Sequence, residues 1–333
     1  EWNIYMVNID SNKIVNSSSN DFRVLYVCSA ARSGSTLTDM FIGGHSQTAS
    51  LGELNFLNKV INLNHKCSCG MDLRICNQWR EVFDAIKHST NIDFLINPYA
   101  YNLWDAISSD TIDYKWQTRS KVLAVNFRKA WLSGRNLLPN LLRDFIPIPL
   151  SLSKALDNKM NLYREIARCW GKSIIVDSSK NDREAIELFK KWPDSIKIVL
   201  LTRDGRGVYF SRRSSGYTQS ESIKGWLNYY QRALPALDKF IPSESLLKIR
   251  YEDLTTKPEE VGRILCNFAH ISFEPEMLDF TRFTRHLVGG NNMRFSSNKK
   301  IELDTRWQTE LCGDELDFFM RTGGDMNRQL GYQ

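Results

Sequence analysis

The segment VLYVCSAARSGSTLTDMF, residues 24–41, constrains the fold more than any other part of this chain. Its first five residues favour a buried strand, a turn of small residues follows, and residues 36–41 favour the start of a helix. This order is typical of a phosphate-binding loop, in which backbone N–H groups at a helix N-terminus face the anion. ATP- and GTP-binding loops have the pattern G-x-x-x-x-G-K-[ST]. Here Ser29 replaces the first glycine, Ser35 replaces the lysine, and the positive charge lies inside the turn at Arg32.

Short aliphatic segments alternate with helical patterns along the rest of the chain. The strand-like segments are 23–28, 173–177, 196–202 and 246–250, and the helical ones are 35–43, 155–170, 182–191 and 221–240. Strands that are apolar along their whole length are typical of a parallel sheet buried on both faces. Because helices separate them, we expect an α/β, three-layer P-loop-like fold with a central parallel sheet.

Residues 80–150 differ from this pattern, because they are rich in aromatic residues and leucine and contain no convincing strand. We expect them to form a mostly helical insertion that covers one edge of the sheet. A chain of 333 residues can form one large α/β domain or two small ones. We expect a single domain over 21–333, preceded by a flexible lead-in at 1–20 that contains the tract NSSSN.

Composition excludes several classes of protein. A hydrophobic content of 42% and a charged content of 25% are ordinary for a soluble globular protein. The net charge of +6 fits an anionic ligand better than a nucleic acid. No apolar run approaches the roughly 20 residues needed to span a bilayer, and the start does not resemble a signal peptide. We expect no membrane partner and a cytoplasmic location, with a trimmed N-terminal anchor and a Golgi lumenal location as the alternative.

Three of the seven cysteines, Cys67, Cys69 and Cys76, form the cluster CSCGMDLRIC. Zinc needs four ligands, and His65 could supply the fourth, but C-x-C spacing is poor for a structural zinc site. We interpret the cluster as reduced structural thiols, with a local disulfide and then zinc as alternatives, and we assign it no catalytic role. The remaining cysteines lie among apolar neighbours and are expected to be buried: Cys28, Cys169, Cys266 and Cys312.

Basic side chains follow three of the predicted strands. The segments after the four strands are SAARSGST, DSSKND, RDGRGVYFSRR and YEDL, and they carry Arg32, Lys180, Arg203 with Arg206, and Tyr251. Ligands of α/β folds gather at the carboxyl ends of the strands. Basic groups at three such ends predict two separate anionic groups on one ligand.

The first and third of these segments have a specific chemistry. Residues 33–36 offer N–H groups and the positive end of a helix dipole, and Arg32 adds a planar fork. The alternative is a glycine-serine turn that caps an ordinary helix. Ser211 lies eight residues after Arg203, about two helical turns, so both can reach one phosphate if a helix joins them. The alternative there is a charged loop in which Asp204 pairs with Arg206.

Together these motifs resemble the sulfotransferases that use 3'-phosphoadenosine 5'-phosphosulfate. RSGSTL is similar to the family's 5'-phosphosulfate loop and RDGRGVYFSR to its 3'-phosphate motif, and DSSK and RYEDL follow in the expected order. The resemblance covers about residues 23–310. Because arginine stands in the loop, it is closer to bacterial and tyrosylprotein-type members than to cytosolic members, which carry lysine there.

The resemblance implies a donor site without magnesium, because the donor has no γ-phosphate. At the 5' end of the donor the resemblance assigns Arg32, Ser33, Gly34, Ser35 and Thr36, and at its 3'-phosphate it assigns Arg203 and Ser211. Tyr251 is expected beside the nucleotide, which it contacts through its hydroxyl or its ring. Arg294, in GGNNMRFSSNKK, is expected to bind a phosphate. That last segment is similar to the family's mobile closing loop, where Lys299 and Lys300 are the basic alternatives.

Transfer of a sulfuryl group needs a base, stabilisation of charge on the moving group and neutralisation of the departing oxygen. Arg32 and Lys180 are the candidates for the last two tasks, the alternative for Lys180 being a solvated charge. The segment GEL resembles the position of a catalytic glutamate in tyrosylprotein-type members, so we nominate Glu53 as the base. His45 is the rival, because histidine serves as base in other branches of the family.

The sequence constrains the identity of the acceptor less than that of the donor. The aromatic residues of the insertion favour a compact small molecule with a hydroxyl or an amine, although most of their rings are expected in the core: Tyr99, Tyr101, Trp104, Tyr114, Trp116 and Trp131. Bacterial secondary metabolism is the expected source of such an acceptor. The alternatives are a tyrosylprotein or carbohydrate sulfotransferase, a P-loop nucleotide kinase, and a catalytically silent nucleotide-binding protein. Ser35 in place of lysine argues against the kinase. The sequence does not indicate an oligomeric state.

Overall fold

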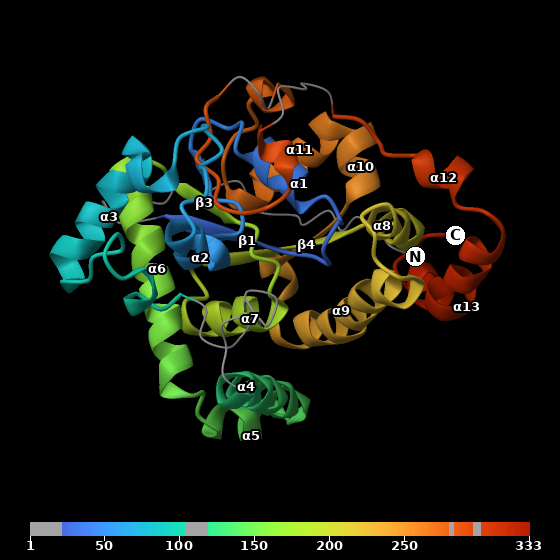
Figure 1. The fold of residues 1–333 in the computed structure, drawn as a ribbon, viewed down its shortest axis with the longest axis horizontal. Helices are drawn as coiled ribbons and strands as arrows, with labels where there is room; N and C mark the ends of the chain where they lie inside the picture. The colour runs from blue at the N-terminus through green and yellow to red at the C-terminus, as the bar shows by residue number, and fades with distance from the viewer. Residues whose placement is uncertain (1–21, 104–118, 280–282, 296–300) are drawn as a thin grey trace.

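The computed structural model describes residues 22–103, 119–279, 283–295 and 301–333. They form a five-stranded parallel sheet in the order β2-β3-β1-β4-β5 (Figure 1). The strands are β1 (Arg23–Cys28), β2 (Thr48–Ser50), β3 (Ile174–Asp177), β4 (Ile196–Thr202) and β5 (Leu246–Arg250). The predicted α/β fold with a central parallel sheet is confirmed. The lead-in expected at 1–20 lies outside the described residues.

Both faces of the sheet are buried. Successive side chains of a strand point to opposite faces, so each strand contributes to two cores. Val24 and Tyr26 of β1 belong to one apolar core, and Leu25 and Val27 belong to the other. Helices α6 (Leu150–Trp170), α7 (Asp182–Lys191) and α9 (Gln219–Phe240) pack on the first face, and α1 (Ser35–Ile42), α10 (Tyr251–Thr256) and α11 (Pro258–Ala269) pack on the second (Figure 1). The predicted three layers are therefore present.

The described part of residues 80–150 contains helices and no strand. Its elements are the end of α3 (Asn77–Thr90), a short 3-10 helix η3 (Pro98–Ala100), α4 (Arg119–Leu137) and α5 (Asn140–Phe145). Trp79 of α3 packs against Trp170 of α6, with ring centroids 5.3 Å apart. The other helices are α2 (Leu57–Asn62), α8 (Gly205–Arg213), α12 (Arg306–Glu310) and α13 (Gly313–Gln329). Among the described residues, no helix is both long and apolar enough to cross a bilayer.

Three details differ from the sequence-based expectations. The edge strand β2 was not predicted, because it has only three residues and two of them are Thr48 and Ser50. Helix α6 begins at Leu150 instead of 155, directly after Pro149, whose fixed φ suits a chain entering a helix. Cys312 is exposed and Cys169 is partly exposed, so only two of the four scattered cysteines are buried, Cys28 and Cys266.

Candidate active site

The turn between β1 and α1 has an unusual backbone. Arg32 and Gly34 both have a left-handed conformation, with φ of 71° and 94°. A Cβ atom on Gly34 would collide with the ring of Tyr251, so glycine is required there on two counts. Ser33 points into the protein, where its Oγ lies 3.3 Å from the hydroxyl of Tyr230. The turn thus packs against two tyrosines, Tyr230 and Tyr251.

A cavity of about 1590 Å³ lies over this turn and the ends of the neighbouring strands. Nearly all residues that the sequence assigned to the site line it: Arg32, Gly34, Ser35, Thr36, Glu53, Lys180, Arg203, Ser211 and Tyr251. Ser33 and Arg294 are not among the lining residues. The first N–H groups of α1 have no partner within the helix, and its first turn has no acidic residue. This wall of the cavity therefore favours an anion.

Arg203 forms the second basic wall. Its Nη1 donates to the carbonyl of Arg32 over 3.1 Å, and its guanidinium stacks 4.5 Å from the ring centroid of Tyr251. The Tyr251 hydroxyl lies 3.3 Å from the carbonyl oxygen of Glu302, so the ring is the part of Tyr251 available to a ligand. Ser211 lies on α8, which begins two residues after Arg203, so a helix joins the two residues as the sequence argument required.

The charged-loop alternative is also realised, because Arg206 forms an ion pair with Asp204 over 2.6 Å. Only Arg203 of the two arginines lines the cavity. Its Nη2 lies 3.2 Å from Asp304, a cavity residue that carried no sequence signal. Arg306 donates a hydrogen bond to the same carboxylate. This hydrogen bond is the largest cause that lowers the pKa of Asp304 to about 2, and the positive charge of Arg203 acts in the same direction.

Glu53 and Lys180 meet in the cavity. The Nζ of Lys180 lies 2.6 Å from Oε1 of Glu53. Lys180 has a left-handed backbone with φ of 67°, and its N–H donates to the carbonyl of Val27 over 3.2 Å. The N–H of Glu53 donates to the carbonyl of Val288 over 2.7 Å. Both side chains are held in a salt bridge, so Lys180 is not the freely solvated lysine of the alternative interpretation.

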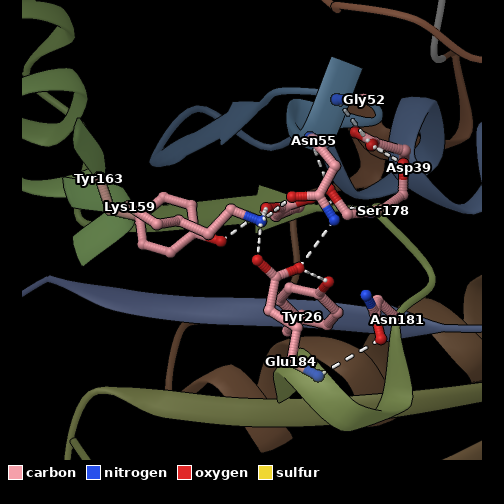
Figure 2. Close-up of polar contacts among 11 residues, drawn as sticks. Tyr26, Asp39, Gly52, Asn55, Lys159, Tyr163, Ser178, Asn181 and Glu184 are labelled. Carbon is pink, nitrogen blue, oxygen red and sulfur yellow. Dashed lines mark hydrogen bonds and ion pairs between the residues drawn. The ribbon is translucent and has the colours of Figure 1, made fainter. Parts of the chain in front are cut away.

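A buried polar network supports the loops that carry this pair (Figure 2). Lys159 of α6 is fully buried, and its Nζ lies 2.8 Å from Glu184, 2.6 Å from Asn55 and 3.3 Å from Asp177. Tyr26 donates to Glu184 over 2.5 Å. Because two carboxylates and an amide oxygen surround the ammonium group, the buried charges are paired, as burial requires.

The network also joins the two catalytic candidates through the backbone. The N–H of Asn55, two residues after Glu53, donates to Oγ of Ser179 over 3.1 Å. Ser179 precedes Lys180, and its own N–H donates to Asp177 over 2.8 Å. The geometry of the Glu53–Lys180 pair therefore depends on the buried network beneath it.

Asp39 of α1 ties the phosphate-loop helix to the same loops. It accepts hydrogen bonds from Ser178 over 2.6 Å, from the N–H of Gly52 over 2.9 Å, and from Ser50 (Figure 2). Burial raises the pKa of Asp39 to about 7, although these hydrogen bonds act in the opposite direction. The sequence analysis did not single out this buried carboxyl group.

His45, the rival base, lies away from the cavity. Its Nε2 donates to the carbonyl of Ser272 over 2.8 Å, and its Nδ1 accepts from the N–H of Gln47 over 3.0 Å. The ring is buried and does not line the cavity. Both nitrogens of this histidine thus have partners within the protein.

The segment expected to close over the donor reaches the cavity with residues 290–293, and the predicted Arg294 does not line it. The N–H of Asn291 donates to Oγ1 of Thr36 over 3.2 Å, next to the cavity. Arg294, in the 3-10 helix η7 (Asn292–Phe295), donates from Nη1 to the carbonyls of Gly289 and Gly290, each over 2.6 Å. Lys299 and Lys300 lie outside the described residues.

The aromatic residues of the insertion that are described do not line the cavity. Tyr101 is buried and its hydroxyl donates to the carbonyl of Asn158 over 2.8 Å, while Tyr99 and Trp131 are exposed. Trp104, Tyr114 and Trp116 lie outside the described residues. The aromatic lining comes from other parts of the chain, with Trp226 and Tyr229 on α9: Phe56, Tyr217, Trp226, Tyr229 and Tyr251. Tyr101 lies in the core, as expected for most of these rings, and the described insertion residues do not supply an aromatic surface for an acceptor.

The chain is similar to one family of known proteins. The profile described as "Sulfotransferase family" matches residues 25–275. We found no matching curated protein. A solved sulfotransferase domain from the curacin biosynthetic pathway is 19% identical, with 94% of this chain and 98% of that chain covered and a TM-score of 0.49. The sulfotransferase domain of the Synechococcus PCC 7002 olefin synthase is 17% identical, with 95% and 98% covered and a TM-score of 0.47. Retinol dehydratase, solved with androsterone and the inactive cofactor PAP, is 13% identical, with 92% and 82% covered and a TM-score of 0.37.

Proposed function

This chain belongs to the sulfotransferase family, and we propose that it moves a sulfuryl group from 3'-phosphoadenosine 5'-phosphosulfate to a hydroxyl or amine of a small molecule. One observation carries the proposal. A single cavity is lined by the start of α1, by Arg203 with Ser211, and by the Glu53–Lys180 pair. These are the parts needed to bind a donor with two anionic ends and to act on one of them.

The donor's 5'-phosphosulfate fits the start of α1, where Arg32 and the N–H groups of Ser35 and Thr36 offer positive charge and hydrogen bonds. Its 3'-phosphate fits Arg203 and Ser211, and the ring of Tyr251 offers a stacking surface. Asp304 now pairs with Arg203, so we expect binding of the 3'-phosphate to rearrange that ion pair. Arg306, which shares Asp304, offers a further positive charge at this end.

In the proposed reaction the acceptor oxygen or nitrogen attacks sulfur, and the bond between sulfur and the bridging oxygen breaks. The electron pair of that bond remains on the 5'-phosphate of the product, adenosine 3',5'-bisphosphate. Glu53 takes the proton of the acceptor, because its carboxylate keeps acceptor sites beyond the one that Lys180 occupies. Lys180 and Arg32 stabilise the negative charge on the departing oxygen and the moving group.

The kinase alternative lacks support at the strand ends. A P-loop phosphotransferase uses a carboxylate after a strand to hold magnesium. Asp177 ends β3, but it is fully buried and binds Lys159, Tyr163 and Ser179. With Ser35 in place of the loop lysine, the turn also lacks the lysine that reaches the β- and γ-phosphates in P-loop enzymes.

The cavity favours a compact acceptor. Its volume exceeds the roughly 300–1,000 Å³ of common ligand pockets, so a nucleotide donor leaves space for a second molecule. Trp226, Tyr229 and Phe56 supply apolar surface there, and Asp182 with Arg232 supplies a charged pair.

The test uses donor labelled in its sulfuryl group and a panel of small alcohols, phenols and amines, an acidic tyrosyl peptide and a sulfatable polysaccharide. We expect label on a small molecule. Label only on the peptide or only on the polysaccharide would replace the acceptor class. Phosphate transfer from labelled ATP in a parallel reaction would support the kinase instead. Tight binding of adenosine 3',5'-bisphosphate without any transfer would support a silent nucleotide-binding protein.

A further inference from the structure

A second cluster of reactive side chains lies outside the cavity. The sulfur atoms of Cys67, Cys69 and Cys76 and Nδ1 of His286 all lie within 4.8 Å of one another. Cys76 Sγ lies 3.8 Å from the sulfur of Cys69, 3.8 Å from that of Cys67 and 3.2 Å from Nδ1 of His286. Cys67 Sγ lies 3.6 Å from the same nitrogen. We propose that these four residues bind one structural zinc ion.

The distances match the edges of a zinc tetrahedron. Zn–S bonds of about 2.3 Å and Zn–N bonds of about 2.0–2.1 Å place the ligand atoms about 3.8 Å apart between sulfurs and about 3.5 Å apart between sulfur and nitrogen. Three of these four separations lie within about 0.1 Å of these values, and the sulfur of Cys76 is somewhat closer to Nδ1 of His286. A disulfide would need sulfurs about 2.05 Å apart, and all three cysteines are free in the structure.

The loop geometry explains how C-x-C spacing serves a metal. Lys66 pairs with Asp72, and the N–H of Cys67 donates to the carbonyl of Met71 over 2.9 Å, so the loop folds back on itself. Gly70, with φ of 91°, allows the tight turn directly after Cys69. This hairpin turns the sulfurs of Cys67 and Cys69 toward Cys76. The sequence pattern alone did not reveal this arrangement.

The position of Cys76 favours the thiolate that zinc requires. Cys76 is the N-cap of α3, where backbone N–H groups stabilise a negative charge.

His286 replaces His65, the residue that the sequence had suggested as a fourth ligand. His65 is exposed and is not part of the cluster. His286 is held in place by contacts that need no metal, because its carbonyl accepts from Nε1 of Trp79 over 2.8 Å. Ser68 donates to the carbonyl of Arg285 over 2.6 Å and accepts from the N–H of Leu287 over 2.8 Å. The site is therefore preformed.

The zinc would join the cysteine loop to a segment that reaches the cavity. Two residues after His286, Val288 pairs with Gly52 and its carbonyl accepts the N–H of Glu53. The next residues include Gly290 and Asn291, which line the cavity. None of the four ligands lines it, and four protein ligands leave no open position for chemistry. The role we propose is structural.

The test is metal analysis of the full chain purified under reducing conditions. We expect about one zinc per chain, and the Cys69→Ser and His286→Ala variants should lose it. Cys312→Ser and His65→Ala are the matched controls and should keep it. Cobalt added to the zinc-free wild type should give the thiolate charge-transfer and tetrahedral ligand-field bands, a readout that needs no variant to fold. Because a structural zinc contributes to folding, its removal should also lower Tm.

Three results would overturn the proposal. One is a reduced wild-type chain that neither contains zinc nor takes up a stoichiometric amount when it is added. Another is equal loss of zinc in His65→Ala and His286→Ala. The third is a disulfide within the cluster, seen as fewer than seven free thiols when the unreduced chain is denatured.

Discussion

The Nζ of Lys180 lies 2.6 Å from Oε1 of Glu53, although the two residues are separated by 127 positions in the sequence. The left-handed backbone of Lys180 and the hydrogen bond between Asn55 and Ser179 bring the two side chains together. A carboxylate and an ammonium group in one cavity give a proton acceptor and a positive charge at the same place. This pair is the centre of the proposed mechanism.

Glu53→Gln should lower kcat by about 10²–10⁴-fold, the usual contribution of a general base. Affinity for adenosine 3',5'-bisphosphate and Tm should change little, because glutamine keeps the size of the side chain. The measurement combines steady-state kinetics, calorimetry and thermal unfolding. A variant that melts earlier but turns over normally would show that Glu53 only stabilises the short helix that follows it.

His45→Ala is the control for the base. Because both ring nitrogens of His45 bind within the protein, we expect this variant to lose stability and to keep the kcat of its folded fraction. A folded but inactive His45→Ala protein, together with an active Glu53→Gln protein, would transfer the role of base to the histidine.

The buried network should dominate stability. Lys159→Met leaves Asp177 and Glu184 without their shared cation, and breaking a buried ion pair costs about 3–5 kcal/mol in the free energy of unfolding. Lys191→Met removes the partner of Asp157 in an exposed pair and should cost about 1 kcal/mol or less. Urea unfolding measures both values. Similar losses in the two variants would contradict the role given to the network.

Asp39 should make stability depend on pH. Its pKa of about 7 in the folded state lies above the ordinary value of 3.8, so the folded state binds the extra proton. The free energy of unfolding should therefore fall as pH rises from about 4 to about 7, by up to about 1.4 kcal/mol per pH unit. Asp39→Asn should flatten this part of the profile, measured by urea unfolding between about pH 5 and about pH 8. An unchanged slope in the variant would mean that Asp39 is ionised in the folded protein at low pH.

The sequence predicted the parts of the fold that depend on local pattern. Strands β1, β4 and β5 and helix α7 have the expected bounds, because short aliphatic runs mark the strands and Asn181 caps the start of the helix. Arg32, Lys180 and Arg203 reach one cavity because parallel strands end at the same edge of a sheet.

What the sequence did not predict depends on contacts between distant segments. His286 joins cysteines 210 or more positions away, and Lys159 finds its partners only when α6 packs on the sheet. Arg294 was expected at a phosphate, but its guanidinium binds the carbonyls of the loop on which it lies. No residue pattern indicates such pairings, since a charge in a sequence does not specify its partner.

Turnover should not require magnesium, because the proposed donor has no γ-phosphate and Ser35 stands where a loop lysine would be. The assay compares activity in magnesium-free buffer after brief treatment with EDTA and after magnesium is added back. Zinc content is measured in the same samples, so that loss of a structural zinc is not mistaken for loss of magnesium. Activity that returns only with magnesium would favour the phosphotransferase.

Binding of adenosine 3',5'-bisphosphate to wild-type and Arg203→Ala protein tests the central claim, a site for this donor, most directly. Losing a charge-assisted hydrogen bond costs about 1.5–3 kcal/mol, which is about a 10- to 150-fold weaker Kd. Calorimetry should show this loss for the bisphosphate, little change for adenosine 5'-phosphate, and little change for either ligand in Arg206→Ala, whose guanidinium pairs with Asp204. Equal losses for the two nucleotides, or none for the bisphosphate, would contradict the assignment of Arg203 to the 3'-phosphate and with it the proposed donor.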